Sequence, residues 1–507
     1  MIIGDTPQTF WARVSLFSAL AGEHQDAGPK VWYDMLEMYY LNNGLYDAVA
    51  AAYYDDGSWI EGMKPLRNPA NRVVEFHVAK LWPGALPDAL PILTENERIL
   101  DPIQKIWAWS NWGSQKQVAA RWYANLGDWF AKVVRHTNDQ GVVDQVYFQQ
   151  IKPQHVTDFE EDNRGHITEI RLDYSIDKAE NGKTFTRMYT EHWDKKAGLY
   201  RTWEHVLDEN SSLSSLGEPT TQQTLAELGI DFVPFGHAKF RDVGEKRGLG
   251  AYVHALDKID EVNRQATRLH QMLFRYNKAI WALEANAQDS TGRPLPPPRV
   301  SGSTGPNNEG STLELGDDAL ISLPGMSKLV SMVPDINYDA ALKILQDQMR
   351  ELEYDLPEMA YYRVREAGGQ LSGRAVRLML SDAIDRAIEA RTNAETVLAQ
   401  VNKMALTYGV NNKLFRDIGT YENGDFEHSF RARPVIEQSE FEAAETMRSE
   451  TQAGVPVVTS ARRAGWSDAE IKQMAEDRAA EQKAQQESLA GAMMRAQANF
   501  DANGARE

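Results

Sequence analysis

Apolar residues between positions 253 and 284 recur at alternating intervals of three and four. They are Ile259, Val262, Ala266, Leu269, Leu273, Tyr276, Ile280 and Leu283. This is the spacing of a heptad seam, the narrow apolar stripe of a helix that packs against other helices. The pattern predicts a helix over Val253–Glu284, about 45 Å long, whose partner helices come from the same chain or from neighbouring subunits.

The segment after this helix has a different pattern. Residues 287–335 are rich in Pro, Gly and Ser and poor in apolar residues, which predicts an exposed loop or a small β-rich excursion. Short strands are expected there at Thr312–Leu315 and Ala319–Leu323. A second helix is expected at Tyr338–Tyr354, because Ala341, Leu345, Met349 and Leu352 share one face.

A third helix is predicted from an N-cap at Ser372 to about Tyr408, after an irregular segment at Leu356–Gly373. The middle of its apolar seam is entirely alanine, which allows a neighbouring helix to approach closely. A strand pair is expected next, around Ile418–Val435. The tail is predicted to be helical at Glu440–Gly454, Ser460–Gly465 and from Ser467 to about Ala496.

The N-terminal half combines two periods. Residues 1 to about 135 are expected to be mainly helical, and the aromatic stripes at Val31–Tyr54 and Gln115–Arg135 are typical of a core. From about Gly141 to Leu207 apolar and polar residues alternate, which predicts an antiparallel meander. The whole pattern indicates an α+β fold that is mainly helical.

Composition narrows the class of protein. The chain has 507 residues, no cysteine, and a formal net charge of −19, from 73 acidic and 54 basic residues. The lack of cysteine excludes disulfides and thiolate metal sites and suits folding in a reducing cytoplasm. Neither a signal peptide nor a membrane-spanning run is expected. The acidity argues against tight binding of DNA phosphates and fits either solubility or a surface past which DNA slides.

No motif supports catalysis. The segment Gly368–Ala375 nearly fits a phosphate-binding loop but has Arg374 and Ala375 where Lys and Ser or Thr are needed. His192 and His205 lie on adjacent predicted strands, yet a paired sheet histidine is a better interpretation than a metal ligand. We therefore expect no catalytic residues, no cofactor and no metal.

The order of elements resembles that of the portal proteins of tailed bacteriophages, in particular the SPP1-like portal group. The most specific local match runs from Leu356-Pro357-Glu358 through Gly368-Gly369 to Ser372-Gly373-Arg374-Ala375-Val376, which opens a long helix. Further matches are Arg67–Gly84 and the tail segment from Val458 to Glu470. The resemblance covers most of the chain, in order.

The resemblance implies a portal fold with wing, stem, clip and crown, assembled into a ring with a central channel. The implied divisions are the wing (1–245, the long helix 372–408 and strands 409–440), the stem helices (246–284 and 338–355), the clip (285–337), the tunnel loop (356–371) and the helical crown (441–507). Two sets of residues are candidates for contact with DNA. The stem candidates are Arg264, Arg268, Arg275 and Lys278, and the tunnel-loop candidates are Tyr361, Tyr362, Arg363, Arg365 and Gln370.

The implied partners are further copies of the chain, in a ring of about twelve, and the double-stranded DNA that passes through it. The resemblance also implies three protein partners: a large terminase, a head–tail adaptor and the major capsid or scaffolding protein. It implies no association with a membrane. The ring would be assembled in the host cytoplasm and reside in the virion, at the portal vertex of the capsid. Two alternatives stay open: a nucleotide-dependent phage enzyme that processes DNA, and another ring protein of the head–tail connector.

Overall fold

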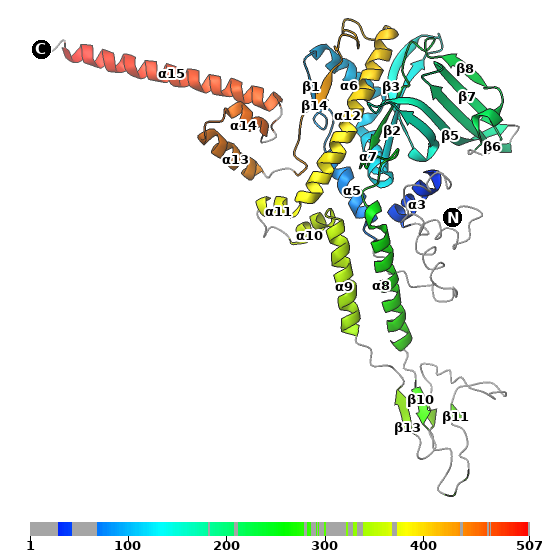
Figure 1. The fold of residues 1–507 in the computed structure, drawn as a ribbon. Helices are drawn as coiled ribbons and strands as arrows, with labels where there is room; N and C mark the ends of the chain where they lie inside the picture. Colours follow the sequence, from blue (N-terminus) through cyan, green and yellow to red (C-terminus); the bar gives the residue numbers. More distant parts are fainter. Residues whose placement is uncertain are drawn as a thin grey trace. The chain divides into compact units, whose positions relative to one another are not determined.

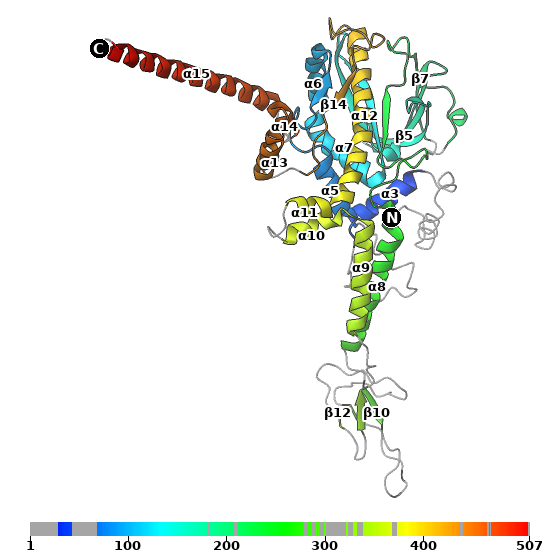
Figure 2. The ribbon, with the colours of Figure 1, turned by 60° about the vertical axis from the view of Figure 1, so that its left-hand side comes forward.

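The structure is a computed structural model in which the chain forms two compact units (Figures 1 and 2). The first contains residues 1–53, 68–257 and 353–507, and the second contains 54–67 and 258–352. The structure describes residues 29–42, 68–180, 183–206, 211–277, 281–284, 291, 293, 299–300, 321–322, 328–331, 338–367, 373–436, 440–463, 466 and 468–504.

Two antiparallel sheets form the β part of the first unit. The three-stranded sheet has the order β3-β2-β9 and the five-stranded sheet has the order β4-β5-β6-β7-β8. Their strands are β2 (Asp128–Thr137), β3 (Val143–Ile151), β4 (Val156–Glu161), β5 (Ile167–Glu180), β6 (Lys183–Asp194), β7 (Leu199–His205), β8 (Thr221–Thr224) and β9 (Phe235–Lys239). The expected meander is confirmed for β5, β6 and β7, whereas β3 pairs with β2 in the other sheet.

The helix expected over Gln115–Arg135 is wrong in its second half. Helix α7 (Trp112–Leu126) ends at Gly127, and Asp128 begins β2. Gly127 has a φ of +89°, and a Cβ there would lie 2.4 Å from the carbonyl oxygen of Gly248. This close approach of two backbones requires glycine and ends the helix. Trp129 and Phe130 are therefore strand residues, although their spacing suggested a helix.

Helices cover the three-stranded sheet and enclose an aromatic core. They are α3 (Pro29–Leu41), α5 (Ala70–Leu81), α6 (Leu100–Trp109), α7 and α12 (Ser381–Asn411), with short 3₁₀ turns η3 (Glu97–Ile99), η4 (Pro153–His155), η5 (Leu213–Leu216) and η6 (Val253–Ala255). Tyr33, Tyr39 and Tyr123 are fully buried, and Trp82, Trp112 and Trp129 cluster with ring centroids 5.4–5.9 Å apart. The prediction that the aromatic stripes are core is confirmed for Tyr33, Tyr39, Tyr123 and Trp129.

Helix α12 lies across β2, β3 and β9 (Figure 1). Its buried positions include Ala383, Ala387, Ala390 and Ala394, as the alanine seam predicts. Helix α5 packs on this seam, with Phe76 against Ala383 and Ala387, as predicted. Strand β9 approaches α12 further along: a Cβ on Gly236 would lie 2.6 Å from Val401 and 2.8 Å from Val397. The single helix expected from Ser372 is divided at Leu380 into α11 (Gly373–Met379) and α12.

The strand pair expected near Ile418–Val435 is not a local hairpin. Strand β14 (His428–Phe430) pairs instead with β1 (Ile92–Thr94), more than 300 residues earlier in the chain. The tail agrees with the prediction: its helices are α13 (Glu440–Gln452), α14 (Val457–Arg463) and α15 (Asp468–Gly504).

The second unit contains most of two helices and a β excursion between them. Helix α8 (Leu256–Asn277) and helix α9 (Tyr338–Asp355) lie side by side in both views (Figures 1 and 2). Two small antiparallel pairs form the excursion: β10 (Trp281–Glu284) with β13 (Lys328–Ser331), and β11 (Arg299–Val300) with β12 (Ile321–Ser322).

The heptad seam of α8 is confirmed in its first half, where Ile259, Val262, Ala266 and Leu269 are buried. The expected extent to Glu284 is wrong, because Trp281–Glu284 pairs with β13 instead of continuing the helix. The strand expected at Thr312–Leu315 lies outside the described residues. No helix in the described part of the chain is long and apolar enough to cross a membrane.

Candidate functional site

The expected tunnel loop is mostly helical. After the turn at Leu356–Glu358, helix α10 (Met359–Ala367) occupies the segment that was predicted to be irregular. Both glycines of the predicted loop, Gly368 and Gly369, lie outside the described residues, as does Gln370. Pro357 ends α9 but does not prevent a new helix, since proline is tolerated just before or within a first helical turn.

Two tunnel-loop candidates pack within their own chain, on α5. The Tyr361 ring lies edge-on to Phe76, with centroids 5.5 Å apart, and the Lys80 ammonium is 5.1 Å from the Tyr361 centroid. The Tyr362 hydroxyl donates to the Arg72 carbonyl oxygen at 2.8 Å. The two roles considered for these tyrosines were contact with DNA and packing against the next subunit; in the structure both side chains contact α5 of their own chain.

The tunnel-loop cations are placed differently. Arg363 is exposed and forms an ion pair with Glu353, so its charge is already partnered within the chain. Arg365 lies on α10. Of the stem candidates, Arg264, Arg268 and Arg275 lie on α8, and Lys278 lies outside the described residues.

A buried carboxylate fixes the start of α10. Glu358 accepts a hydrogen bond from His77 Nε2 at 3.1 Å, and both side chains are fully buried. Arg386 of α12 lies 3.7 Å from the same carboxylate oxygen. Burial raises the pKa of Glu358, but the His77 hydrogen bond and the Arg386 charge outweigh it and leave the pKa below its usual value. Glu358 therefore ties α10 to both α5 and α12.

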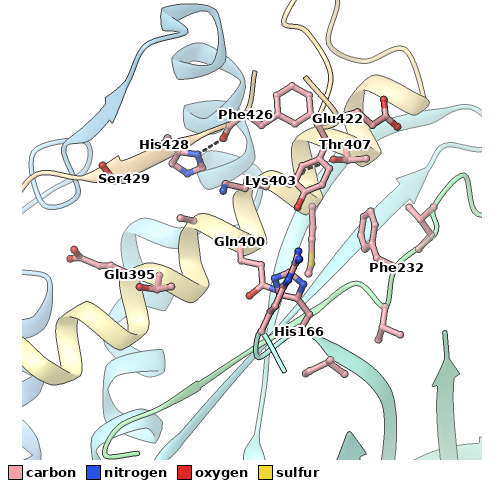
Figure 3. Close-up of a pocket in the computed structure, with 18 of the residues that line it drawn as sticks. His166, Phe232, Glu395, Gln400, Lys403, Thr407, Glu422, Phe426, His428 and Ser429 are labelled. Carbon is pink, nitrogen blue, oxygen red and sulfur yellow. Dashed lines mark hydrogen bonds between the residues drawn. The ribbon is translucent and has the colours of Figure 1, made fainter. Parts of the chain in front are cut away.

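An open trough with a volume of about 1120 Å³ runs along α12. We call it the α12 trough. Its floor is α12 from Ile388 to Asn411, one wall is the segment 420–433, and the other wall is 226–233 with the sheet turns at 164–167 and 195. Figure 3 shows Gln400 and Lys403 on the floor, His166 and Phe232 on one side, and His428 and Ser429 on the other.

Charge in the α12 trough is unevenly compensated. Its lining contains five Arg and Lys side chains but only three carboxylates. The basic residues are Arg164, Lys195, Arg391, Lys403 and Arg433, and the acidic residues are Asp231, Glu395 and Glu422. Arg433 pairs with Glu395, and Lys403 pairs with Glu427 at 2.5 Å.

Arg391 lies at the base of the trough with no carboxylate of its own. It is 5% exposed and donates to the carbonyl oxygens of Arg433 and Lys80. Burial and the nearby Arg433 charge lower the pKa of Arg391 to about 10. Burial also raises the pKa of Glu395. Burial is the largest cause of both shifts, so the two side chains lie in a site with little water.

A second polar cluster lies under the sheets and resembles a catalytic arrangement. His237 donates from Nε2 to Asp128 at 2.7 Å and from Nδ1 to Glu161 at 2.6 Å. Burial lowers the pKa of His237, but the two carboxylates outweigh it and raise the pKa above its usual value. The side chains of His237 and Asp128 are fully buried and that of Glu161 is 20% exposed, so the cluster joins β2, β4 and β9 in the interior.

The two sheet histidines have separate partners. His192 lies 2.9 Å from Glu169, and His205 lies 2.8 Å from the Thr190 hydroxyl, which donates to Asp173. Among the described residues, no group of His, Asp and Glu is arranged to hold a metal ion.

Sequence reasoning missed the α12 trough. Its floor and the wall formed by 226–233 come from segments more than 150 residues apart, and no local pattern reports that proximity. The sequence contained one local signal. Arg391 and Glu395 lie one turn apart beside the alanines of the seam, so two opposite charges are placed next to a face that is otherwise buried.

No protein-family model matches the sequence, and no curated protein is similar to it. Solved structures give weak matches. A chain from the neck of a native gene transfer agent (GTA) particle, computed with C12 symmetry, is 11% identical over 80% of this chain and 88% of that chain, with a TM-score of 0.38. A chain from the virion of the native GTA particle is 11% identical over 88% of this chain and 95% of that one, also at 0.38.

The neck of the empty GTA particle, computed with C6 symmetry, gives a TM-score of 0.39 at 12% identity over 80% of this chain and 91% of that chain. The chain is thus similar in outline to components of a GTA neck and virion. Since TM-scores below 0.5 do not establish a shared fold, the function is argued from the residues of this chain.

Proposed function

We propose that the chain is the subunit of a portal ring, the channel through which double-stranded DNA enters and leaves a phage or phage-like capsid. The observation that carries the proposal is the order α8, β excursion, α9, α10, α12: two long helices side by side, a β-rich connection between their ends, and a short helix before the longest helix of the core. This order agrees with the stem, clip, tunnel segment and long wing helix of the portal group that the sequence resembles.

The buried face of α8 supports the stem role. Within the chain, α8 buries Ile259, Val262, Ala266 and Leu269, and α9 buries Leu345 and Leu352. A two-helix pair of this length has a narrow apolar seam and needs further neighbours for stability. In a ring, the stems of adjacent subunits are those neighbours, and the charged faces of the helices line or flank the channel.

The acidic charge of the chain fits passage of DNA. Cation–phosphate contacts supply most non-specific affinity for DNA, so a channel subunit with a net charge of −19 holds DNA weakly. Under this proposal the cations of α8 (Arg264, Arg268 and Arg275) and of α10 (Arg363 and Arg365) make modest phosphate contacts. The tyrosines of α10 position that helix on α5 instead of touching DNA.

Native mass spectrometry with negative-stain imaging of the purified protein tests the ring. We expect a closed ring of about twelve copies with a central hole of about 20–40 Å, wide enough for a DNA duplex. A compact closed dimer at every protein concentration, together with nucleotide hydrolysis, would instead favour the enzyme alternative.

The residue roles need a packaging assay. Reversing the charge of Arg264, Arg268 and Arg275 together, or of Arg363 and Arg365 together, should lower the DNA packaged by about tenfold while rings stay intact. Arg416→Glu is the matched control, because Arg416 is exposed and lies on neither helix. Unchanged packaging in a variant with intact rings would remove the corresponding residues from the channel.

A further inference from the structure

The α12 trough is long enough to hold a segment of polypeptide. Its floor extends from Ile388 to Asn411, which is about 35 Å of helix. An extended segment of about ten residues spans that distance. Between its charged residues the floor carries small side chains such as Thr392, Thr396 and Ala399, and Ile388 at its start is 46% exposed.

One wall of the trough offers backbone for pairing. Strand β14 pairs with β1 on one edge only, in a two-stranded sheet. Ser429 and Phe430 of β14 line the trough. A strand edge without a neighbour binds an added extended segment through main-chain hydrogen bonds, and the side chains of that segment then contact the adjoining surface.

Three buried donors at the trough have no acceptor. They are Nε of Arg391, Nε of Arg433 and Nε2 of Gln400. Arg391 is only 5% exposed. The side chain of Gln400 projects from α12, the floor of the trough (Figure 3). Unsatisfied buried donors are costly, and two guanidinium groups beside a single carboxylate leave one positive charge without a counter-charge. A carboxylate supplies both the missing acceptors and the missing charge.

We propose that the α12 trough binds an acidic, extended segment of a second copy of this chain, with a carboxylate of that segment against Arg391 and Arg433. The occupant is assigned by charge and by availability. The chain has a formal net charge of −19, so a second copy is acidic overall and complements the positive trough. This inference rests on the proposed ring, which brings a second copy beside each subunit.

Site-specific cross-linking tests the occupant. A photoreactive p-benzoylphenylalanine replaces Thr396, which is exposed on the floor of the trough, and in a control protein it replaces Thr137, which is exposed at the end of β2 outside the trough. In purified rings we expect the probe at 396 to join two copies, at least about tenfold above the control. Peptide mapping should place the partner end in a segment that contains Asp or Glu.

The outcomes separate this inference from the proposed function. Closed rings in which the probe at 396 reacts only within its own chain, or not at all, would overturn the trough inference and leave the portal proposal standing. A cross-link to a different protein would also overturn it. If no ring forms under any condition, the portal proposal itself fails, and with it the inference.

Substitutions test the charge requirement. Arg433→Gln should make rings dissociate at lower salt concentration, whereas Arg416→Gln, outside the trough, should not. Because Arg433→Gln leaves Glu395 without its partner, the double variant Arg433→Gln/Glu395→Gln keeps the pair neutral and serves as a folding control. Thr396→Trp fills the floor without disturbing the core and should lower ring yield by about tenfold. Wild-type salt resistance in both the double variant and Thr396→Trp would contradict the inference.

Discussion

The two longest helices of the chain, α12 and α15, are stable for opposite reasons. Helix α12 buries residues along its whole length against four strands (β2, β3, β9 and β14) and two helices (α5 and α6), and the middle of its seam is alanine. In α15 Ile471 is the one buried residue among those whose burial the structure describes. Helix α15 depends on the intrinsic helix preference of Ala, Glu, Gln and Lys, whereas α12 depends on what surrounds it. A helical pattern in a sequence therefore does not reveal whether the helix is stabilised by its own residues or by the elements packed around it.

The largest expected difference comes from shortening one large apolar side chain in each helix. Leu398 in α12 is fully buried, and Met494 in α15 is 73% exposed. Leu398→Ala should lower the free energy of unfolding by about 4 kcal/mol, through lost burial and the cavity left behind. Met494→Ala should change it by less than about 0.5 kcal/mol. Chemical denaturation followed by tryptophan fluorescence measures both, and equal effects would abolish the distinction between the helices.

Removing the buried charge of Glu358, which lies beside Arg386 of α12, gives the next largest effect. Glu358→Gln removes the carboxylate that His77 and Arg386 face, and should lower the free energy of unfolding by about 3 kcal/mol at pH 7. Since the pKa of Glu358 lies below its usual 4.5 in the folded chain, its stabilising effect is present above pH 4.5 and is lost as the pH falls through the lowered pKa. The difference in free energy of unfolding between wild type and Glu358→Gln should therefore become smaller as the pH falls below 4.5.

Glu487→Gln in α15 is the matched control for Glu358→Gln. Glu487 is exposed, so its substitution should leave the free energy of unfolding unchanged at either pH. A gap between wild type and Glu358→Gln that stays constant down to pH 3 would show that the variant acts through packing and not through the charge of the carboxylate.

The strand layer beneath α12 has the opposite pH dependence. The pKa of His237 on β9 is raised, so the stabilisation from its two carboxylate bonds is complete below pH 6.5 and is lost as the pH rises through the raised pKa. The free energy of unfolding should therefore fall as the pH rises above 6.5. His237→Gln should remove this slope. Urea denaturation at several pH values measures it, and an unchanged slope in the variant would assign the effect to another group.

The smallest expected effect concerns α15 alone. Ala484→Gly should destabilise this exposed helix by about 1 kcal/mol, because glycine has more backbone freedom to lose. Amide hydrogen exchange should become faster in α15 and stay unchanged in α12 and β2. Faster exchange in α12 would mean that the tail and the core unfold together.

Sequence patterns predicted the elements whose stability is local. Helix α9 and the three tail helices have nearly the expected bounds, because their caps and seams lie within each segment. The errors concern elements that depend on distant residues. Asp128–Thr137 is a strand because Gly127 meets Gly248, and His428–Phe430 pairs with Ile92–Thr94. Trp281–Glu284 leaves the helical seam to pair with Lys328–Ser331.

The candidate site was harder to predict than the fold. Tyr361 and Tyr362 were selected as side chains of a loop, and whether they face a partner or α5 depends on a helix almost 300 residues earlier in the chain. The α12 trough is likewise made by the meeting of distant segments. The charges of Arg391 and Glu395 within an alanine seam are the one local feature that marked it.

The attachment of α10 has a mechanical consequence. Glu358 is held by His77 and Tyr361 rests on Phe76, so two points three residues apart in one segment are fixed to two adjacent residues of α5. A single attachment would act as a pivot about which α10 could swing. Two attachments resist rotation, so a force applied along α10, such as drag from a moving polymer, passes directly into α5 and through Arg386 into α12. The load is then borne by the rigid core and not by the chain ends of α10.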